Sequence, residues 1–366
     1  MSIAVLHVAQ PRDGGVARYV VAAARDQVAR GWTVTVACPD GGRLAGDLAR
    51  HGIARLRWPA VRSPGPASMT ETLRLRALVE RLRPDVLHLH AAKAGLAGRL
   101  GPRRPVPVLF QPHGWSWLAV RGALRAATLA WERAAARRTD LFLCVGESEA
   151  LQGREQGVEG RYAVVRNGVD LDRFRPAGDF DRAAARAALG VCPGTPLAVC
   201  VGRLTRQKGQ DVLLPAWPRV LRRCPDAELV LVGDGDLLPA LRSAGTPGVT
   251  FAGPVDDVRL WLAAADLVVL PSRWEGLSLA VLEALAVGRP VVVSDVPGLA
   301  EVVPPEVGDR VPPDDPDALA DALAGRLWGG PPAGTVVAAT ARHAARFDAR
   351  LTYERLAAET AAVAGR

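Results

Sequence analysis

The sequence is poor in the features that mark secreted and membrane-spanning proteins. Its five cysteines are an odd number with no C-x-x-C spacing, which argues against both a disulfide framework and a zinc site. No apolar run approaches the roughly 18 residues that a membrane-spanning helix needs, and the first residues, MSIAVLHV, lack the basic leader of a secretory signal. We therefore expect a soluble protein of a reducing compartment, the cytoplasm.

Lysine is also scarce. Only two of the 46 basic residues are lysines, Lys93 and Lys208, and all the others are arginines. In so biased a chain, a retained lysine indicates a position where a compact and mobile point charge is needed.

The length and composition predict two globular domains. The chain has 366 residues, of which 49% are hydrophobic and 23% charged, so it can bury sizeable cores. Strand-like and helix-like segments alternate twice, first from Ile3 to Arg166 and again from Leu197 to Ser294. Such alternation predicts an α/β fold with two parallel, doubly wound sheets. In sheets of this kind ligands bind beyond the carboxyl ends of the strands, so the loops there are the candidate sites.

Charge differs between the two halves. Residues 1–175 carry 27 Lys and Arg against 15 Asp and Glu, whereas residues 176–366 carry 19 against 23. The basic half suggests an acidic partner, either an anionic lipid surface or a phosphorylated substrate, although dispersed arginines are often only solvated. Nucleic acid is not expected, because no aromatic residues are interleaved with the arginines as in an RNA-binding platform.

Three of the candidate loops carry suggestive residues. Gly14 and Gly15 stand between a strand and a helix, where backbone N–H groups can meet an anion, although a plain tight turn fits equally well. Gly202–Gly209 (GRLTRQKG) carries Arg203 and Lys208 at one strand end, where both can converge on a diphosphate; it departs from a P-loop at Gln207 and Gly209. In the third loop, Glu275 precedes a helix that would carry Glu283 among apolar residues, and a buried glutamate needs a partner such as a ligand hydroxyl.

Five short motifs follow one another along the chain: G-G-x-x-R at 14–18, H-G at 113–114, N-G-V-D-x-x-x-F at 167–174, G-R-L-x-x-x-K-G at 202–209 and E-x7-E at 275–283. Taken in this order, they resemble the motifs of retaining glycosyltransferases of family 4, which have the GT-B fold. The resemblance runs from Gly14 to about Asp315, and its single motifs are weak but their order and spacing are specific.

The resemblance implies a GT-B architecture of two Rossmann-like domains facing a central cleft. Residues 1–175 would form an acceptor-binding domain, residues 176–345 a nucleotide-sugar-binding domain, and residues 346–366 a helix that packs back on the first domain. The activity implied is the transfer of a hexose or N-acetylhexosamine from a nucleoside-diphosphate sugar, with a UDP-sugar favoured, to a hydroxyl of a small, secondary-metabolite or carrier-linked acceptor. The donor is a co-substrate, and neither a cofactor nor a metal is expected.

The resemblance also assigns roles to individual residues. Arg203 and Lys208 would bind the donor diphosphate and stabilise the departing nucleoside diphosphate, Glu275 would orient the donor sugar, and His113 would lie beside it. Glu275 is not assigned as a nucleophile. The remaining donor-binding positions implied are Gly14, Gly15, Gly202, Leu277, Ser278, Leu279 and Glu283, of which Glu283 would hold the ribose.

The acceptor side is less defined. Lys93, Trp115 and Trp117 follow strands of the first domain and could bind an anionic, sugar-like acceptor, although structural tryptophans are equally plausible. Two alternatives stay open: a peripheral-membrane enzyme that uses GDP-mannose or a UDP-sugar on a lipid acceptor, and a non-catalytic sugar-nucleotide-binding partner. The helix expected at Leu118–Arg138 bears several arginines, but its small residues Gly122, Ala123, Ala126 and Ala127 favour packing against a sheet over contact with a membrane.

Overall fold

The computed structural model describes residues 2–100 and 105–365, without the side chains of residues 179 and 180. The chain divides into two compact units. Unit 1 runs to Arg166 and includes the last segment from Leu351, and unit 2 is Asn167–Arg350. The predicted boundary after residue 175 therefore lies inside unit 2, because residue 169 forms a β-bridge with residue 348 and the N–H of residue 177 bonds to the carbonyl of residue 287.

Unit 1 is built on a seven-stranded parallel sheet in the order β3-β2-β1-β4-β5-β6-β7. The order reverses between β1 and β4, which is where a sheet of this type opens a ligand-binding crevice. The strands are β1 (Ala4–Ala9), β2 (Thr33–Cys38), β3 (Ala54–Arg57), β4 (Val86–His90), β5 (Val108–Gln111), β6 (Leu141–Cys144) and β7 (Tyr162–Val164).

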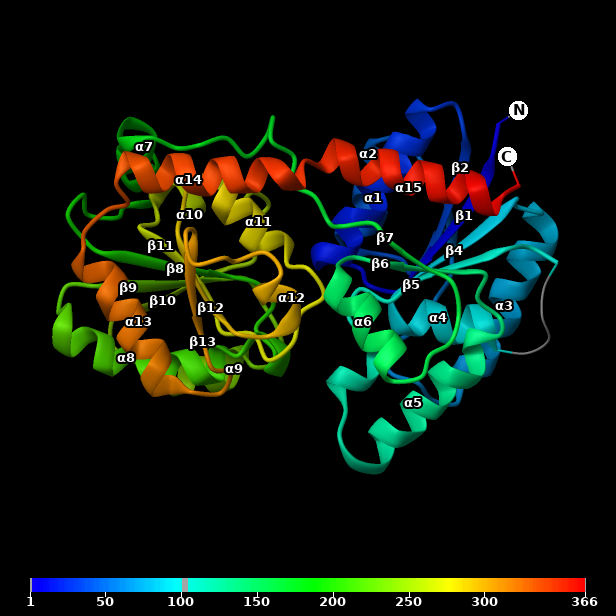
Figure 1. The fold of residues 1–366 in the computed structure, drawn as a ribbon, viewed down its shortest axis with the longest axis horizontal. Helices are drawn as coiled ribbons and strands as arrows, with labels where there is room; N and C mark the ends of the chain where they lie inside the picture. The colour runs from blue at the N-terminus through cyan, green and yellow to red at the C-terminus, as the bar shows by residue number, and fades with distance from the viewer. Residues whose placement is uncertain (1, 101–104, 366) are drawn as a thin grey trace. The chain divides into compact units, whose positions relative to one another are not determined.

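Helices cover both faces of this sheet, and the last helix of the chain joins them (Figure 1). Leu356 of that helix is fully buried in the same cluster as Tyr19, Leu109 and Leu141. The helices of unit 1 are α1 (Gly14–Ala29), α2 (Gly42–Arg50), α3 (Ala67–Leu82), α4 (Ala91–Arg99), η1 (Ser116–Ala119), α5 (Gly122–Ala136), α6 (Glu147–Glu155) and α15 (Ala349–Val363).

Unit 2 repeats the plan with six parallel strands in the order β10-β9-β8-β11-β12-β13 and a reversal between β8 and β11. Its strands are β8 (Leu197–Val201), β9 (Glu228–Val232), β10 (Val249–Gly253), β11 (Leu267–Leu270), β12 (Val291–Ser294) and β13 (Gly308–Val311). Its helices are α7 (Asp179–Leu189), η2 (Arg206–Lys208), α8 (Gln210–Arg223), α9 (Leu238–Ser243), α10 (Arg259–Ala264), α11 (Leu279–Ala286), α12 (Pro297–Ala300), α13 (Pro316–Trp328), α14 (Gly334–Ala344) and η3 (Ala345–Phe347).

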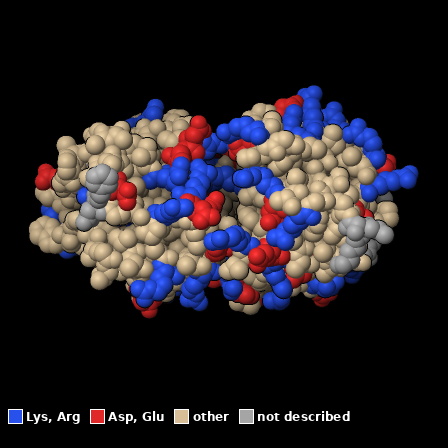
Figure 2. Space-filling model, turned by 90° about the horizontal axis from the view of Figure 1, so that it is seen from above, with Lys and Arg blue, Asp and Glu red and all other residues tan. Residues whose placement is uncertain are grey.

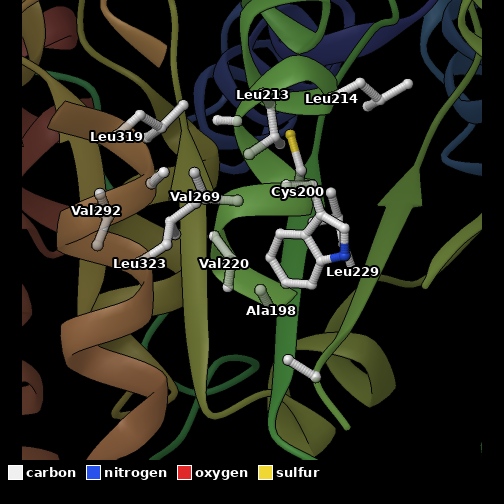
Figure 3. Packing of buried hydrophobic residues seen from close by; sticks show 14 of the residues in the cluster. Ala198, Cys200, Leu213, Leu214, Val220, Leu229, Val269, Val292, Leu319 and Leu323 are labelled. Atoms are coloured by element: carbon white, nitrogen blue, oxygen red, sulfur yellow. The ribbon is translucent and has the colours of Figure 1, made fainter. Parts of the chain in front are cut away.

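The core of unit 2 is almost wholly aliphatic. Figure 3 shows Leu213 and Val220 of α8 and Leu319 and Leu323 of α13 packed over the strand residue Val269. Strands that are buried on both faces have this continuous apolar composition. The predicted fold class, two Rossmann-like parallel sheets, is confirmed.

One sequence-based expectation about α5 is wrong. Gly122, Ala123, Ala126 and Ala127 do not pack against a sheet: all four are exposed, and Leu124 between them is 61% exposed. The helix is held through its second half, where Leu129, Glu132, Ala135 and Ala136 are buried. Over the described residues, no helix combines the length and the apolar character needed to cross a membrane.

Candidate active site

The two cations predicted at the start of unit 2 lie in the loop that follows β8. Lys208 reaches back along this loop, so that a Cβ atom on Gly202 would stand 3.5 Å from Lys208 Cε. The Lys208 ammonium pairs with Glu275, with Nζ 2.5 Å from Oε1, while the Arg203 guanidinium is exposed and donates to Gln207 Oε1 at 3.3 Å. One strand end thus carries two basic groups, one of them held in place by a carboxylate.

Gly209 explains why a glycine follows the lysine. Its φ is +70°, and a Cβ atom there would lie 1.9 Å from the carbonyl oxygen of Pro271. Only glycine tolerates both the left-handed backbone and the close approach. This contact brings the loop after β8 against the loop after β11, which bears Glu275.

The two glutamates of the third motif occupy different kinds of structure, as their spacing predicts. Glu275 lies in the loop after β11 with its side chain 7% exposed, and Glu283 projects from α11 with the whole residue 5% exposed. Ser278 stands just before α11, whose first N–H groups have no partners within the helix and carry partial positive charge. Leu277 and Leu279 flank this end, so the helix start and the Lys208 ammonium are attached to the same loop.

Two residues not singled out from the sequence hold this site together. Asn167 is buried, and its amide Nδ2 donates to the carbonyl of Leu277 at 2.7 Å. Arg273 donates to Asp211 and to Asp314 and also bonds the carbonyl of Arg206 at 2.7 Å. These carboxylates raise the pKa of Arg273, so its charge is permanent. Asn167 belonged to a recognised motif, but the role of Arg273 depends on residues distant in sequence that no spacing reveals.

In unit 1, the glycine pair lies at the start of α1. Gly14 has φ +85° and is half-buried, Gly15 is exposed, and Asp13 precedes them without a side-chain cap. Asp13 instead accepts from the N–H of Arg43 at 2.8 Å. The helix start is therefore open to an anionic group.

His113 follows β5 in a constrained conformation. Its φ is +53°, which is uncommon outside glycine and costs free energy, so it persists only where the surroundings impose it. The surroundings do so through Glu149, a buried carboxylate that accepts from the N–H of Gly114 at 2.5 Å and from the N–H of Val145 at 2.8 Å. Glu149 was not predicted as a site residue, since it reads from sequence as a surface glutamate in the first turn of a helix.

Behind His113, three further histidines are fully buried on one face of the sheet: His7, His88 and His90. Desolvation lowers the pKa of His7 to about 4 and that of His113 to about 3, so these rings are neutral near pH 7. One nitrogen of each of the three buried rings lies within 4.8 Å of the others. Among the residues with described positions, these three histidines form the group that could hold a metal. Both nitrogens of His7 already hydrogen-bond, however, to His90 at 2.9 Å and to Gln27 at 2.7 Å.

Lys93 does not lie open to an acceptor. Its side chain is 3% exposed, and Nζ lies 2.6 Å from Oε2 of Glu71, which is 2% exposed. The ammonium also donates to Ser68 Oγ at 2.9 Å and to the carbonyl of Ser63 at 3.2 Å. In this structure the charge of Lys93 is neutralised inside unit 1.

Trp115 and Trp117 are likewise part of the core. They are 1% and 2% exposed and stack on each other with ring centroids 4.5 Å apart. The indole N–H of Trp115 donates to the carbonyl of Glu149 at 2.7 Å. Their burial favours the structural interpretation over contact with an acceptor.

Many of the surface arginines are ion-paired. Figure 2 shows basic and acidic groups interspersed over the face in view. Exposed pairs such as Arg57–Asp40 and Arg350–Asp348 contribute little to stability, but they reduce the local excess of positive charge. The exposed first turns of α5 instead bring Arg121 and Arg125 together without a carboxylate in their own segment.

Family models match both units. One described as "Glycosyltransferase Family 4" matches residues 13–173, and one described as "Glycosyl transferases group 1" matches residues 195–327. The first region contains Gly14, Gly15 and His113, and the second contains Arg203, Lys208, Glu275 and Glu283.

Individual glycosyltransferases are similar to the chain as well. The chain is 31% identical to a GDP-mannose-dependent monoacylated α-(1-6)-phosphatidylinositol monomannoside mannosyltransferase of Corynebacterium glutamicum over 73% of each chain. It is 33% identical to a D-inositol 3-phosphate glycosyltransferase of Saccharomonospora viridis over 94% of this chain and 88% of the relative. Among solved structures, Anabaena HepE in complex with UDP and glucose superposes with a TM-score of 0.80 at 21% identity, covering 98% of this chain and 99% of HepE, which supports the fold.

Proposed function

Because the chain belongs to glycosyltransferase family 4 and is a retaining glycosyltransferase, we propose that it moves a hexose or N-acetylhexosamine from a nucleoside-diphosphate sugar, with a UDP-sugar favoured, to a hydroxyl of a small, secondary-metabolite or carrier-linked acceptor. The observation that carries the proposal is the strand end of unit 2 where Lys208 and Arg203 stand beside the loop that leads into α11. Two cations and a helix start suit a diphosphate leaving group.

The transfer step develops negative charge on the departing nucleoside diphosphate. Lys208 and Arg203 neutralise it, and preorganised charges of this kind stabilise a transition state more than the ground state. Glu275, paired with Lys208 before the donor binds, keeps the ammonium in position and offers its carboxylate to the hydroxyls of the donor sugar. Glu283, buried on α11, binds the ribose hydroxyls.

In unit 1, we assign Gly14 and Gly15 to the donor diphosphate and His113 to a hydroxyl of the transferred sugar. The open start of α1 supports the first assignment and the constrained backbone of His113 supports the second. Lys93, Trp115 and Trp117 are left out of the proposed acceptor site, because all three are buried. The two cations let the reaction proceed without a metal, so activity should survive EDTA.

A second candidate is a lipid-linked acceptor at an anionic membrane. The exposed basic start of α5 favours it. The two relatives described above divide along the same line, since one name specifies a phosphatidylinositol-based acceptor and the other D-inositol 3-phosphate. An anionic acceptor is common to both names.

The decisive experiment presents the protein with UDP-glucose, UDP-galactose, UDP-N-acetylglucosamine and GDP-mannose, without and with acceptors of both kinds. Ligand-observed NMR reports binding, and the anomeric signals of the product report retention. One preferred donor is expected, and its use should fall about 10²–10³-fold in Lys208→Ala and Arg203→Ala. Binding of none of the four donors, or variants as fast as the unaltered protein, would refute the assignment.

A further inference from the structure

A line of hydrogen-bonded side chains crosses the interior of unit 1 and ends at His113. It begins on α1, where Gln27 Oε1 lies 2.7 Å from Nε2 of His7 on β1. His7 Nδ1 lies 2.9 Å from Nε2 of His90 on β4, and His90 Nδ1 lies 3.1 Å from Nε2 of His113. Gln27, His7 and His90 are each fully buried, whereas His113 is partly exposed.

With Gln27 Oε1 facing His7 Nε2, proton counting fixes every ring in this line. A neutral imidazole has one N–H and one lone pair, and a carbonyl oxygen only accepts. Gln27 Oε1 therefore requires the proton of His7 on Nε2, which leaves the lone pair on Nδ1. His90 must then donate from Nε2 and accept on Nδ1, and His113 must donate from Nε2. The lone pair of His113 Nδ1 is left for a ligand.

The other orientation of the Gln27 amide would reverse the whole line. With its NH₂ group toward His7, every ring would take the opposite tautomer, and His113 would present an N–H on Nδ1. Neither His7 nor His90 can carry protons on both ring nitrogens, because burial keeps the two rings uncharged near pH 7. One amide on α1 thus controls which nitrogen of His113 is protonated.

We propose that Gln27, acting through His7 and His90, is a positioning residue that holds His113 as the tautomer with its proton on Nε2. His113 Nδ1 is then a hydrogen-bond acceptor, and it accepts a hydrogen bond from a donor-sugar hydroxyl. The identity of this ligand rests on the proposed function; the tautomer of His113 does not.

A metal site that includes His88 is the alternative to this line of hydrogen bonds. His88 lies beside His7 and His90, and the three could in principle bind a cation. Both nitrogens of His7 and of His90 already take part in the line, so a cation bound to these rings would break it. Stoichiometric metal in the purified protein therefore contradicts the proposal, whereas its absence after preparation without chelator agrees with it.

The test is long-range ¹H–¹⁵N NMR on protein labelled at its six histidines, which distinguishes a protonated ring nitrogen from one with a lone pair. His113 is assigned from the spectrum of His113→Gln. In the unaltered protein His113 should be protonated on Nε2; protonation on Nδ1, or an even mixture, overturns the proposal without any variant.

The variant that breaks the line is Gln27→Met, which keeps the size of the side chain and removes the acceptor. Its matched control is Gln111→Met, since Gln111 is equally buried and its Oε1 meets Nε2 of His88, 3.1 Å away, outside the line. Gln27→Met should convert His113 to a tautomer mixture, and Gln111→Met should not. A pure Nε2 tautomer in Gln27→Met would overturn the proposal.

Kinetic measurements then test whether the tautomer of His113 affects the use of the donor. Gln27→Met should lower kcat/KM about 10-fold for the preferred donor, which corresponds to about 1.4 kcal/mol. If the tautomer shifts and kcat/KM does not, the assigned contact between His113 and the sugar is wrong while the line stands. If no donor is used at all, the proposed function fails, and the spectra still decide the tautomer.

Discussion

Each unit holds one of the two lysines of the chain, and each lysine pairs with a glutamate. Lys93 and Glu71 in unit 1 have side chains 3% and 2% exposed, whereas Lys208 and Glu275 in unit 2 are 16% and 7% exposed. The first ammonium is also bonded to Ser68 and Ser63, so its donors are used. Scarcity of lysine marked both positions, but only the surroundings distinguish a structural charge from one that can meet a ligand.

The strands in the interiors of the two units also differ in polarity. Strands β8, β11 and β12 of unit 2 are continuous runs of small and aliphatic residues, while β1 and β4 of unit 1 bury three histidines among such residues. An apolar core is stabilised by burial alone. A polar core depends on every partner being present, because an orphaned buried group costs about 1–3 kcal/mol. The three buried histidines should make unit 1 the more sensitive to pH.

The largest effect is expected on stability, at Lys93. Lys93→Met removes one partner of a buried ion pair and leaves the Glu71 carboxylate without its charge partner, which costs about 3–5 kcal/mol. Urea unfolding followed by tryptophan fluorescence measures this loss. The kcat/KM of the folded fraction should stay within about twofold, because the ammonium lies in the core.

The control restores the balance of charge. In Lys93→Met with Glu71→Gln, the amide oxygen can still accept from the N–H of Val61, as Glu71 Oε1 does at 2.9 Å. Most of the lost stability should return. A single variant as stable as the unaltered protein, or one with a specific loss of kcat, would assign Lys93 to ligand binding after all.

Lys208→Met should show the opposite pattern. The loss of one cation beside the leaving group should lower kcat/KM by about 10²–10³-fold, equivalent to about 2.7–4 kcal/mol, with a small change in Tm. Arg206→Met is the matched control, since Arg206 is exposed in the same loop. If the two variants lose activity equally, the loop acts through its total charge and not through Lys208.

The candidate residues of unit 2 lie in loops at strand ends, as expected from the sequence, whereas Lys93, Trp115 and Trp117 of unit 1 are buried, and the difference has a physical reason. Arg203, Lys208 and Glu275 occur in short loops at strand ends, so spacing alone places them. The edge strand β13 lies beyond the alternating stretch expected from Leu197 to Ser294, because Gly308–Val311 has charged residues at its centre and lacks an apolar run. The burial of Lys93 depends on Glu71. The line from Gln27 to His113 joins residues of α1, β1, β4 and the loop after β5. A local sequence pattern cannot show contacts between segments that lie so far apart along the chain.

A pH titration sharpens the contrast between the interiors. The native pKa of His7 is about 4 against 6.5 when unfolded, so between these values the unfolded chain binds a proton that the native state does not. The free energy of unfolding should thus fall as pH drops from 6.5 toward 4, by about 1.4 kcal/mol per pH unit for His7 alone. Burial lowers the pKa of His88 and His90 as well, which adds to the loss.

Unit 2 contains His343, whose pKa is also lowered by burial, but its shifted carboxylate responds only at lower pH. Its Asp257 has a pKa of about 2, held down by Arg259, so the stability from this group is lost only as pH falls below 3.8. Hydrogen exchange, corrected for the intrinsic rate, should show β1 and β4 losing protection near pH 5 while β8 and β11 keep theirs. Equal loss in both units would mean that the buried histidines are not what makes unit 1 sensitive to acid.

The smallest expected effect concerns the surface of unit 1. Arg121 and Arg125 occupy the exposed start of α5 next to Leu124, which is 61% exposed. Each arginine near anionic lipid contributes about 1 kcal/mol, and the small residues between them leave the backbone free to approach a surface. We expect weak, salt-sensitive co-sedimentation with anionic vesicles at ~0.15 M salt and none with neutral vesicles.

The matched comparison lies in unit 2. Arg219 and Arg223 have the same spacing on α8, but both pair with carboxylates of α13: Arg219 with Asp317 and Asp321, and Arg223 with Asp321. Arg121→Glu with Arg125→Glu should abolish pelleting, because two reversals remove the attraction and add repulsion, whereas Arg219→Glu with Arg223→Glu should leave it unchanged. Pelleting that survives the first pair would place the lipid contact elsewhere. Protein that never pellets would instead favour a small soluble acceptor, and the charge of α5 would then serve only solvation.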